Sequence, residues 1–501
     1  MQLRYVWLLA VPLAIGLSAA GNSRVVDAVK AGDREALRAL LRQRADPNAA
    51  ERDGTTALHW AVRADDLDTT LMLIRAGANV NAANRYAITP LSIAATNANA
   101  PLVEALLKSG ANANSEGPDG ETALMTAARA GNPDIVRALI ARGASANATE
   151  RWQGQTALMW AATENNAAAV KVLLDHGADP AIRSKQLTFL DYRYETNGMA
   201  VFQLPKGGWT ALMYAARENA MDAVAAMADL KVDLNATSQP EGSTALQLAI
   251  INVHYDLARL LLDKGADPNV PDSTGMTALY AAVDMRAPAN MLTRPEPKPH
   301  DSIDTLGLVK VLLAHHADPN ARLKKPIIGR HQNLVGDASL AEGATPLARA
   351  SKACDIPVMR LLLDAGADAT LTLKDRTTTA MMAANGAPEP KALEALQLLV
   401  DHGVDVNAFN ANGQTILHNA AGRGANSIVE YVAGKGAKLD RRDKQNRTAL
   451  DVALGLGGGG RRGAGAGRGR GGQANEQTAA LLRELMAQKG LATPPAPSDA
   501  K

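Results

Sequence analysis

The sequence predicts an all-α repeat solenoid, and three observations lead to that prediction. A threonine recurs before a short, alanine-rich helical segment, and the steps from Thr56 to Thr89 and from Thr89 to Thr122 are both 33 residues. A second helical segment with a single apolar stripe follows each alanine-rich one. Neither segment can bury its apolar face alone, and self-similarity at this period is typical of stacked repeats. The recurring threonines are Thr56, Thr89, Thr122, Thr156, Thr210, Thr244, Thr277, Thr345, Thr379, Thr415 and Thr448.

The unit at 118–147 shows the local signals most clearly. Gly120 marks a turn, because glycine accepts a positive φ without steric cost. An alanine-rich segment at 123–130 follows as the first helix. Asn132 is placed to cap the second helix, and Gly143 is placed to end it. The unit therefore predicts turn, helix, turn and helix in that order.

The same residues resemble the ankyrin repeat over nearly the whole chain, from Asn22 to Gly490. The first half of the motif stands at Gly54-Thr-Thr-Ala-Leu-His59, Thr89-Pro-Leu91, Gly343-Ala-Thr-Pro-Leu347 and Gly413-Gln-Thr-Ile-Leu-His418. The second half stands at Gly77-Ala-Asn-Val-Asn81, Gly265-Ala-Asp-Pro-Asn269 and Gly403-Val-Asp-Val-Asn407. The resemblance implies stacked helix-turn-helix units with short β-finger turns, in an exported, bacterial-type protein of many repeats.

The N-terminus is typical of a secretory signal peptide at residues 1–20. Arg4 precedes an apolar run, and small residues at Ser18-Ala19-Ala20 suit signal peptidase. An uncleaved anchor is the alternative, although the run is short for a membrane span. The next segment predicts a capping helix pair at 21–50 with a charged outer face.

Breaks in the repeat spacing divide the rest of the chain. A β-hairpin finger, a Pro-rich loop, a second finger insertion and a Gly/Arg-rich loop interrupt the regular repeats. The predicted order is repeats at 51–184, a hairpin finger at 185–206, repeats at 207–285, a Pro-rich loop at 286–305, the end of the interrupted repeat at 306–322, a finger insertion at 323–342, repeats at 343–454, a flexible Gly/Arg loop at 455–475, a capping helix at 476–490 and a disordered tail at 491–501.

The hairpin finger carries the predicted partner-binding residues. Two β-prone runs flank Asn197-Gly198, which is a strong hairpin signal. Large aromatic residues gather there in a chain that is only 3% aromatic, and they supply contact area at low entropic cost. A small core within the finger is the competing interpretation. The predicted contact residues are Phe189, Tyr192, Tyr194, Phe202 and Trp209.

The sequence indicates no catalytic machinery. His59 and His418 stand in the Thr-x-Leu-His position, where the family resemblance implies a bond to the histidine's own turn. Adjacent His315 and His316 rarely make a metal site without further ligands. Cys354, the single cysteine, is expected as a buried small residue inside a helix. We therefore expect no enzyme activity, no catalytic residues, no cofactor and no metal.

These observations predict a non-catalytic scaffold that binds an unidentified protein partner on the concave surface of its fingers and first helices. Two alternatives stay open: an enzyme or ligand-binding protein with a site built from the insertions, and a polyanion- or envelope-binding role of the Gly/Arg loop. Nucleic acid is not favoured, because the net charge is only +2 and that loop lacks stacking aromatics. We expect a monomer without a transmembrane span after signal cleavage, exported to the periplasm or secreted.

Overall fold

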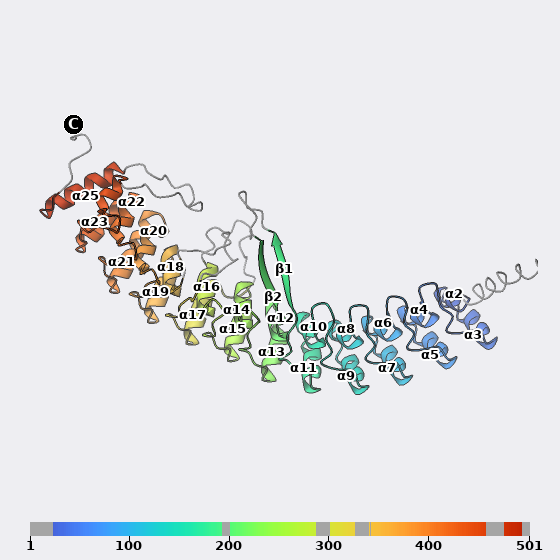
Figure 1. Cartoon of the computed structure of the whole chain (residues 1–501). Helices are drawn as coiled ribbons and strands as arrows, with labels where there is room; N and C mark the ends of the chain where they lie inside the picture. The colour runs from blue at the N-terminus through green and yellow to red at the C-terminus, as the bar shows by residue number, and fades with distance from the viewer. Residues whose placement is uncertain are drawn as a thin grey trace, which may run out of the picture. The chain divides into compact units, whose positions relative to one another are not determined.

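The computed structural model describes residues 24–192, 201–286, 301–325, 340, 342–456 and 475–492. The chain divides into two compact units, unit 1 at Met1–Leu248 and unit 2 at Ala249–Lys501. Each unit is a stack of helix pairs in two layers (Figure 1), which confirms the predicted repeat solenoid. The predicted signal peptide and most of the Pro-rich loop, the second finger insertion, the Gly/Arg loop and the tail lie outside the described residues. Among those residues, no helix combines the length and the apolar character that crossing a bilayer requires.

Unit 1 contains a layer of first helices and a layer of second helices. The first layer is α2 (Arg24–Lys30), α4 (Ala57–Arg63), α6 (Pro90–Thr96), α8 (Ala123–Ala130), α10 (Ala157–Thr163), α12 (Ala211–Arg217) and the start of α14 (Ala245–Ile251). The second layer is α3 (Arg34–Arg42), α5 (Leu67–Arg75), α7 (Ala100–Lys108), α9 (Pro133–Ala141), α11 (Ala167–Asp175) and α13 (Met221–Asp229). A typical first helix, α8, packs against α6, α10 and its own partner α9.

Unit 2 repeats this arrangement. Its first layer is α16 (Ala278–Arg286), α18 (Pro346–Ala353), α20 (Thr379–Gly386), α22 (Ile416–Arg423) and α24 (Ala449–Ala453). Its second layer is α15 (Tyr255–Asp263), α17 (Thr305–Ala314), α19 (Ile356–Asp364), α21 (Glu389–Asp401), α23 (Asn426–Gly434) and α25 (Glu476–Gln488). Arg286 and Thr305 are helical, so the predicted Pro-rich loop is shorter at both ends than the sequence suggested.

The recurring threonine caps the first helix. Thr122 shows the geometry, since its hydroxyl accepts a hydrogen bond from the Met125 backbone at 3.3 Å. The prediction that Thr379 holds this place is wrong by one residue. Thr378 is the cap and accepts from the Met381 backbone at 3.1 Å, whereas the buried Thr379 hydroxyl donates to the Ala369 carbonyl at 2.8 Å. Three successive threonines left the register open in the sequence, and the cap geometry resolves it.

The core lies between successive first helices and between the two helix layers. Leu124, Leu158 and Leu246 occupy equivalent positions and are each 1% exposed. Alanines fill most of the remaining buried positions of these helices, so neighbouring helices can approach closely. Cys354 is also buried, but it ends α18 in the left-handed conformation (φ 49°) instead of lying inside the helix.

An asparagine in the loop after the second helix ties one repeat to the next. The Asn114 side chain donates from Nδ2 to the Gly143 carbonyl at 2.7 Å and accepts from the Ser145 backbone at 2.8 Å. Because both bonds reach the next repeat, one amide sets the spacing of two successive loops. The same pair of bonds is made by Asn48, Asn81, Asn147, Asn269, Asn320 and Asn407.

The inserted segment before α12 forms an antiparallel pair of strands, β1 (Gln186–Tyr192) and β2 (Val201–Gly207). Their register places Phe189 opposite Leu204 and Asp191 opposite Phe202. The Asn197-Gly198 turn lies outside the described residues, and only the backbone is described for 187–206. This pair is a lengthened version of the finger, the turn that precedes each first helix (Figure 1).

Candidate protein-binding surface

The fingers of unit 1 share one backbone conformation. Two residues before the capping threonine, the chain turns through a positive φ, which is 85° at Gly54 and 81° at Gly120. A Cβ at Gly54 would also lie 3.2 Å from the Cα of Asn84 in the next finger, so glycine suits both the turn and the close approach. Backbone bonds join several neighbouring fingers, since the Arg85 N–H donates to the Asp53 carbonyl at 2.8 Å and the Arg151 N–H donates to the Asp119 carbonyl at 2.6 Å. These bonds hold the fingers of each pair side by side.

A groove of about 660 Å³ lies between these fingers and the first helices α4, α6, α8 and α10. Its floor includes the residue four places after each capping threonine, namely Trp60, Ile93, Thr126 and Trp160. The finger side includes Asp53, Tyr86, Pro118 and Glu121. Because the position recurs once per repeat, it points the same way in all four helices, and the groove follows the stack.

Cationic side chains lie over both tryptophan rings of the groove. The Lys30 ammonium is 4.6 Å from the centre of the Trp60 ring, and the Arg63 guanidinium is 5.4 Å from it. The Arg129 guanidinium is 5.0 Å from the centre of the Trp160 ring. A cation within about 6 Å of an aromatic centre is attracted to the ring face. The groove thus combines large apolar faces with fixed positive groups.

Glu51 completes the surroundings of Trp60. It accepts hydrogen bonds from the Lys30 ammonium at 2.9 Å and from the Trp60 indole N–H at 2.7 Å. The Lys30 hydrogen bond, and then that of Trp60, hold the pKa of the Glu51 carboxyl below its ordinary value against the opposing effect of burial. The carboxylate therefore remains charged at neutral pH and fixes the indole ring in one orientation.

The two histidines of the Thr-x-Leu-His motif join neighbouring fingers. His59 Nδ1 faces the Thr56 backbone N–H at 3.1 Å, and its Nε2 lies 3.0 Å from the Ile88 carbonyl of the next finger. A backbone N–H can only donate and a carbonyl can only accept, so these partners select the neutral ring with its proton on Nε2. Burial lowers the pKa of His59 below its ordinary value and outweighs the opposing effect of the Ile88 hydrogen bond. Both ring nitrogens are in use, which favours the structural interpretation of this residue.

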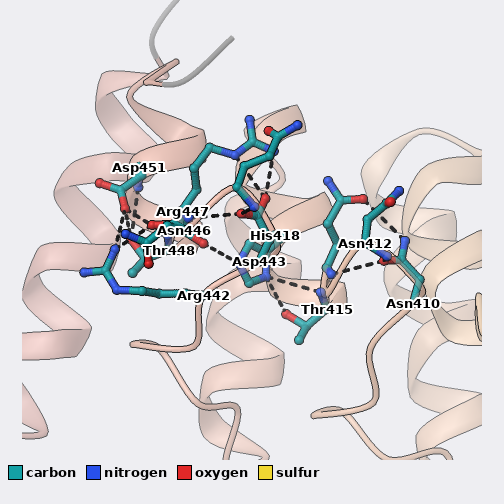
Figure 2. Close-up of polar contacts among 12 residues, drawn as sticks. Asn410, Asn412, Thr415, His418, Arg442, Asp443, Asn446, Arg447, Thr448 and Asp451 are labelled. Carbon is teal, nitrogen blue, oxygen red and sulfur yellow. Dashed lines mark hydrogen bonds and ion pairs between the residues drawn. The ribbon is translucent and has the colours of Figure 1, made fainter. Parts of the chain in front are cut away.

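His418 repeats this arrangement in unit 2, where Figure 2 shows the surrounding contacts. Its Nδ1 faces the Thr415 backbone N–H at 3.2 Å, and its Nε2 lies 3.1 Å from the Arg447 carbonyl. Asp443 holds that next finger in shape, because its carboxylate accepts from the Arg447 backbone at 3.0 Å and from the Arg447 guanidinium at 2.8 Å. Thr448 and Asp451 then form the capping box of α24, the last helix of the first layer. The expected bond of this histidine to its own turn is present, and its ring also bonds to the following repeat.

The residues predicted to bind a partner are placed as follows. Phe189 and Tyr192 lie on β1 and Phe202 lies on β2, all described by backbone alone, while Tyr194 lies outside the described residues. Trp209 lies against α12, with its ring centre 5.4 Å from that of Tyr214 and 5.2 Å from the Arg217 guanidinium. The Trp209 ring therefore contacts side chains of the helix that follows it in the same repeat.

The groove residues Trp60 and Trp160 were missed by sequence reasoning, which looked for aromatic residues gathered in one window. Their common offset from the capping threonine was the available signal. Exposure adds to it, because two large apolar residues on the finger side of the groove are exposed: Tyr86 by 49% and Ile88 by 37%. Such grouping of exposed apolar side chains is typical of interaction sites.

The described residues contain no cluster of three or more His, Cys, Asp or Glu that could hold a metal ion. His315 Nε2 lies 3.3 Å from an Asp263 carboxylate oxygen, and His316 takes the left-handed position (φ 62°) that glycine occupies in other repeats. Burial raises the pKa of the Cys354 thiol to about 11, so the reactive thiolate is scarce at neutral pH.

Comparison with known proteins agrees with this architecture. A family model described as "Ankyrin repeats (3 copies)" matches residues 25–116, 91–184, 187–272 and 212–293, which together exceed half of the chain. A second model, "Ankyrin repeats (many copies)", matches residues 399–453.

Several curated proteins are similar over shorter stretches. The chain is 29% identical to the B-cell lymphoma 3 protein homolog of Mus musculus over 212 residues, 42% of this chain and 39% of that protein. It is 32% identical to the neurogenic locus Notch protein of Drosophila melanogaster over 136 residues, 27% of this chain and 4% of that protein. It is 28% identical to a putative ankyrin repeat protein of fowlpox virus over 179 residues, 36% of this chain and 32% of that protein. The similarity thus spans at most about two fifths of these relatives' length.

Proposed function

The chain belongs to the ankyrin-repeat family, and from that premise we propose that it is a non-catalytic scaffold that binds a protein partner in the groove of unit 1. The observation that carries this proposal is the pair Trp60 and Trp160 on the groove floor, each beneath a fixed cation. Aromatic and arginine side chains dominate the binding energy of protein interfaces. Repeat stacks of this kind also present an extended surface that suits a partner in contact with several units.

The chemistry of the described residues supports a binding role over a catalytic one. The histidine nearest to the groove has both ring nitrogens engaged by finger backbone. The buried cysteine has a raised pKa. A site built from the insertions after Arg183, Arg286 and Leu323 is the alternative, and turnover of a small molecule that stops when those insertions are removed would favour it.

The test is capture of partners from a native extract by the full chain and by the Trp60→Ala and Trp160→Ala variants, with mass spectrometry and then titration of the protein captured. Each substitution should weaken binding by about 2 kcal/mol or more, roughly 30-fold in Kd, if the tryptophan is an anchor. Leu230→Ala is the matched control, because Leu230 is 40% exposed and lies outside the groove. Equal capture by all four proteins, with unchanged melting, would reject the groove as the site.

We propose the hairpin finger as a second contact with the same partner. It falls where the family's binding fingers lie, and its sequence concentrates rigid aromatic residues. The deciding variant joins Arg183 directly to Gly207. Intact folding with weakened binding supports the contact, retained binding rejects it, and loss of folding favours a core within the finger.

We also propose that the protein is exported and acts as a monomer. The motivation for export is the basic, apolar and small-residue pattern of positions 1–20. N-terminal sequencing of the mature protein should begin near Gly21, and recovery from the cytoplasm with Met1 intact would reject export. Sedimentation of the mature chain should give the mass of one copy.

A further inference from the structure

The fingers of unit 2 differ in charge from those of unit 1. The described finger segments before α18, α20, α22 and α24 of unit 2, here called the basic finger row, contain nine Lys and Arg against four Asp and Glu. The first four fingers of unit 1 contain three Lys and Arg against six Asp and Glu. The basic finger row is 322–325, 342–344, 372–377, 409–414 and 440–447, and the unit 1 segments compared are 50–55, 84–88, 116–121 and 150–155. The overall charge of +2 therefore conceals a local accumulation of positive charge.

The acidic residues within this row are largely occupied by their own fingers. Asp443 accepts from the Arg447 guanidinium at 2.8 Å, Asp375 accepts from the Thr377 hydroxyl at 2.9 Å, and Glu342 pairs with the Lys374 ammonium at 2.7 Å. Each of these carboxylates therefore holds a turn in shape or pairs with a neighbouring finger.

Unlike these carboxylates, several exposed cations of the row are available to bind a ligand. Lys324, Lys325 and Lys444 are exposed, and no carboxylate of the described chain lies within ion-pair distance of them. The fingers that carry them are tied by backbone bonds, since the Lys444 N–H donates to the Asn412 carbonyl at 2.9 Å. The positive groups thus stand on a connected edge with fixed backbone spacing.

Phe409 holds two of the guanidinium groups in place. The Arg376 guanidinium lies 5.0 Å from the centre of the Phe409 ring, and the Arg441 guanidinium lies 4.0 Å from it. The three side chains come from three successive fingers, so the contact runs along the row. Arginines held against an aromatic ring lose less rotamer freedom when they bind a carboxylate, which they can engage with two parallel hydrogen bonds.

We propose that the basic finger row is a docking surface for an acidic segment of a protein, rich in Asp and Glu and bound in an extended form along the fingers. Charge complementarity identifies the class of ligand. Nucleic acid fits less well for two reasons. Phe409 is the single aromatic residue of these segments, so the row offers no succession of rings on which bases could stack. Asp375, Asp440 and Asp443 interrupt the positive charge, which disfavours a ligand with a continuous row of phosphates.

The experiment measures fluorescence anisotropy of a labelled peptide, in which Asp and Glu alternate with Gly and Ser, as the full chain is titrated into it. The same peptide with Asn and Gln in place of the acids is the ligand control. The triple variant Arg376→Ala, Arg441→Ala and Lys444→Ala should weaken binding of the acidic peptide at least tenfold. Phe409→Ala should weaken it severalfold without any change of charge, because the two guanidinium groups are then no longer held in place. Lys310→Ala is the matched control, since Lys310 is an exposed cation on the second-layer helix α17.

Four outcomes bear on the proposal. Tenfold loss in the triple variant, little change in the Lys310→Ala control and affinity that falls with added salt support it. Equal binding of the acidic and amide peptides overturns it. Loss only when Arg461, Arg462, Arg468 and Arg470 are replaced with Gln overturns it and assigns the anion binding to the Gly/Arg loop. Tighter binding of an oligothymidylate or of anionic phospholipid vesicles at the same salt concentration also overturns it. Trp60→Ala leaves this affinity unchanged, so failure of the groove proposal and failure of this one are separable.

Discussion

Replacing Asn114 tests whether the loop asparagines hold the repeats together. In the wild-type chain the Asn114 side chain donates to the Gly143 carbonyl at 2.7 Å and accepts from the Ser145 N–H at 2.8 Å. The Asn114→Ala variant loses both hydrogen bonds. A hydrogen bond within a protein contributes about 0.5–1.5 kcal/mol net. Two bonds between the same two repeats predict a loss of about 1–3 kcal/mol, and the exposure of the side chain favours the lower half of that range.

The loss should appear locally, because each repeat is coupled mainly to its neighbours. Hydrogen exchange by mass spectrometry on the full chain should therefore show faster exchange around Gly143 and Ser145, together with a lower denaturant midpoint. Asn114→Asp is the matched variant, because it keeps the acceptor oxygen and removes the donor, and we expect an intermediate effect. Thr370→Asn is the reciprocal change: Thr370 stands four residues after Gly366, as Asn114 does after Gly110, and an amide there should add a bond to the next repeat. Reasoning from the asparagine bonds is refuted if Asn114→Ala leaves both exchange and midpoint unchanged.

Three further outcomes are expected. Leu124→Ala, at a site 1% exposed between first helices, should cost about 2–5 kcal/mol, and a much smaller loss in urea denaturation would mean that the assigned helix faces are incorrect. The native pKa of His59 is below its ordinary value of 6.5, so as the pH falls this residue takes up a proton in the unfolded chain before it does so in the native chain. Its stabilising effect is complete above pH 6.5 and is lost as the pH falls toward its native pKa; His418 has the same direction of shift, and melting of His59→Gln and wild type should differ less at acid pH than at neutral pH. Cys354, with a pKa of about 11, should react slowly with iodoacetamide in the native chain at neutral pH and rapidly in urea, and fast native labelling would contradict its burial.

The repeat architecture was predictable from local signals because each unit is specified within about 33 residues. A turn glycine, a capping threonine and a stripe of apolar residues act over a few positions, and their recurrence identified the stack. The hairpin finger was suggested in the same way by two β-prone runs around Asn197-Gly198. Where the local signal was degenerate, as in Thr377-Thr378-Thr379, only the hydrogen bond to the Met381 backbone identified the cap.

The binding surface depended instead on contacts between repeats. Trp60 and Trp160 are 100 positions apart in the sequence, yet they line one groove because stacking repeats the same helix face. The ring of Phe409 gains its two guanidinium partners from the fingers before and after its own. The second hydrogen bond of His59 is with the Ile88 carbonyl of the following repeat, 29 residues away. The local sequence pattern therefore determines the fold of each repeat. Which side chains meet on a surface depends on how each repeat is positioned against the next, and only the packed structure contains that information.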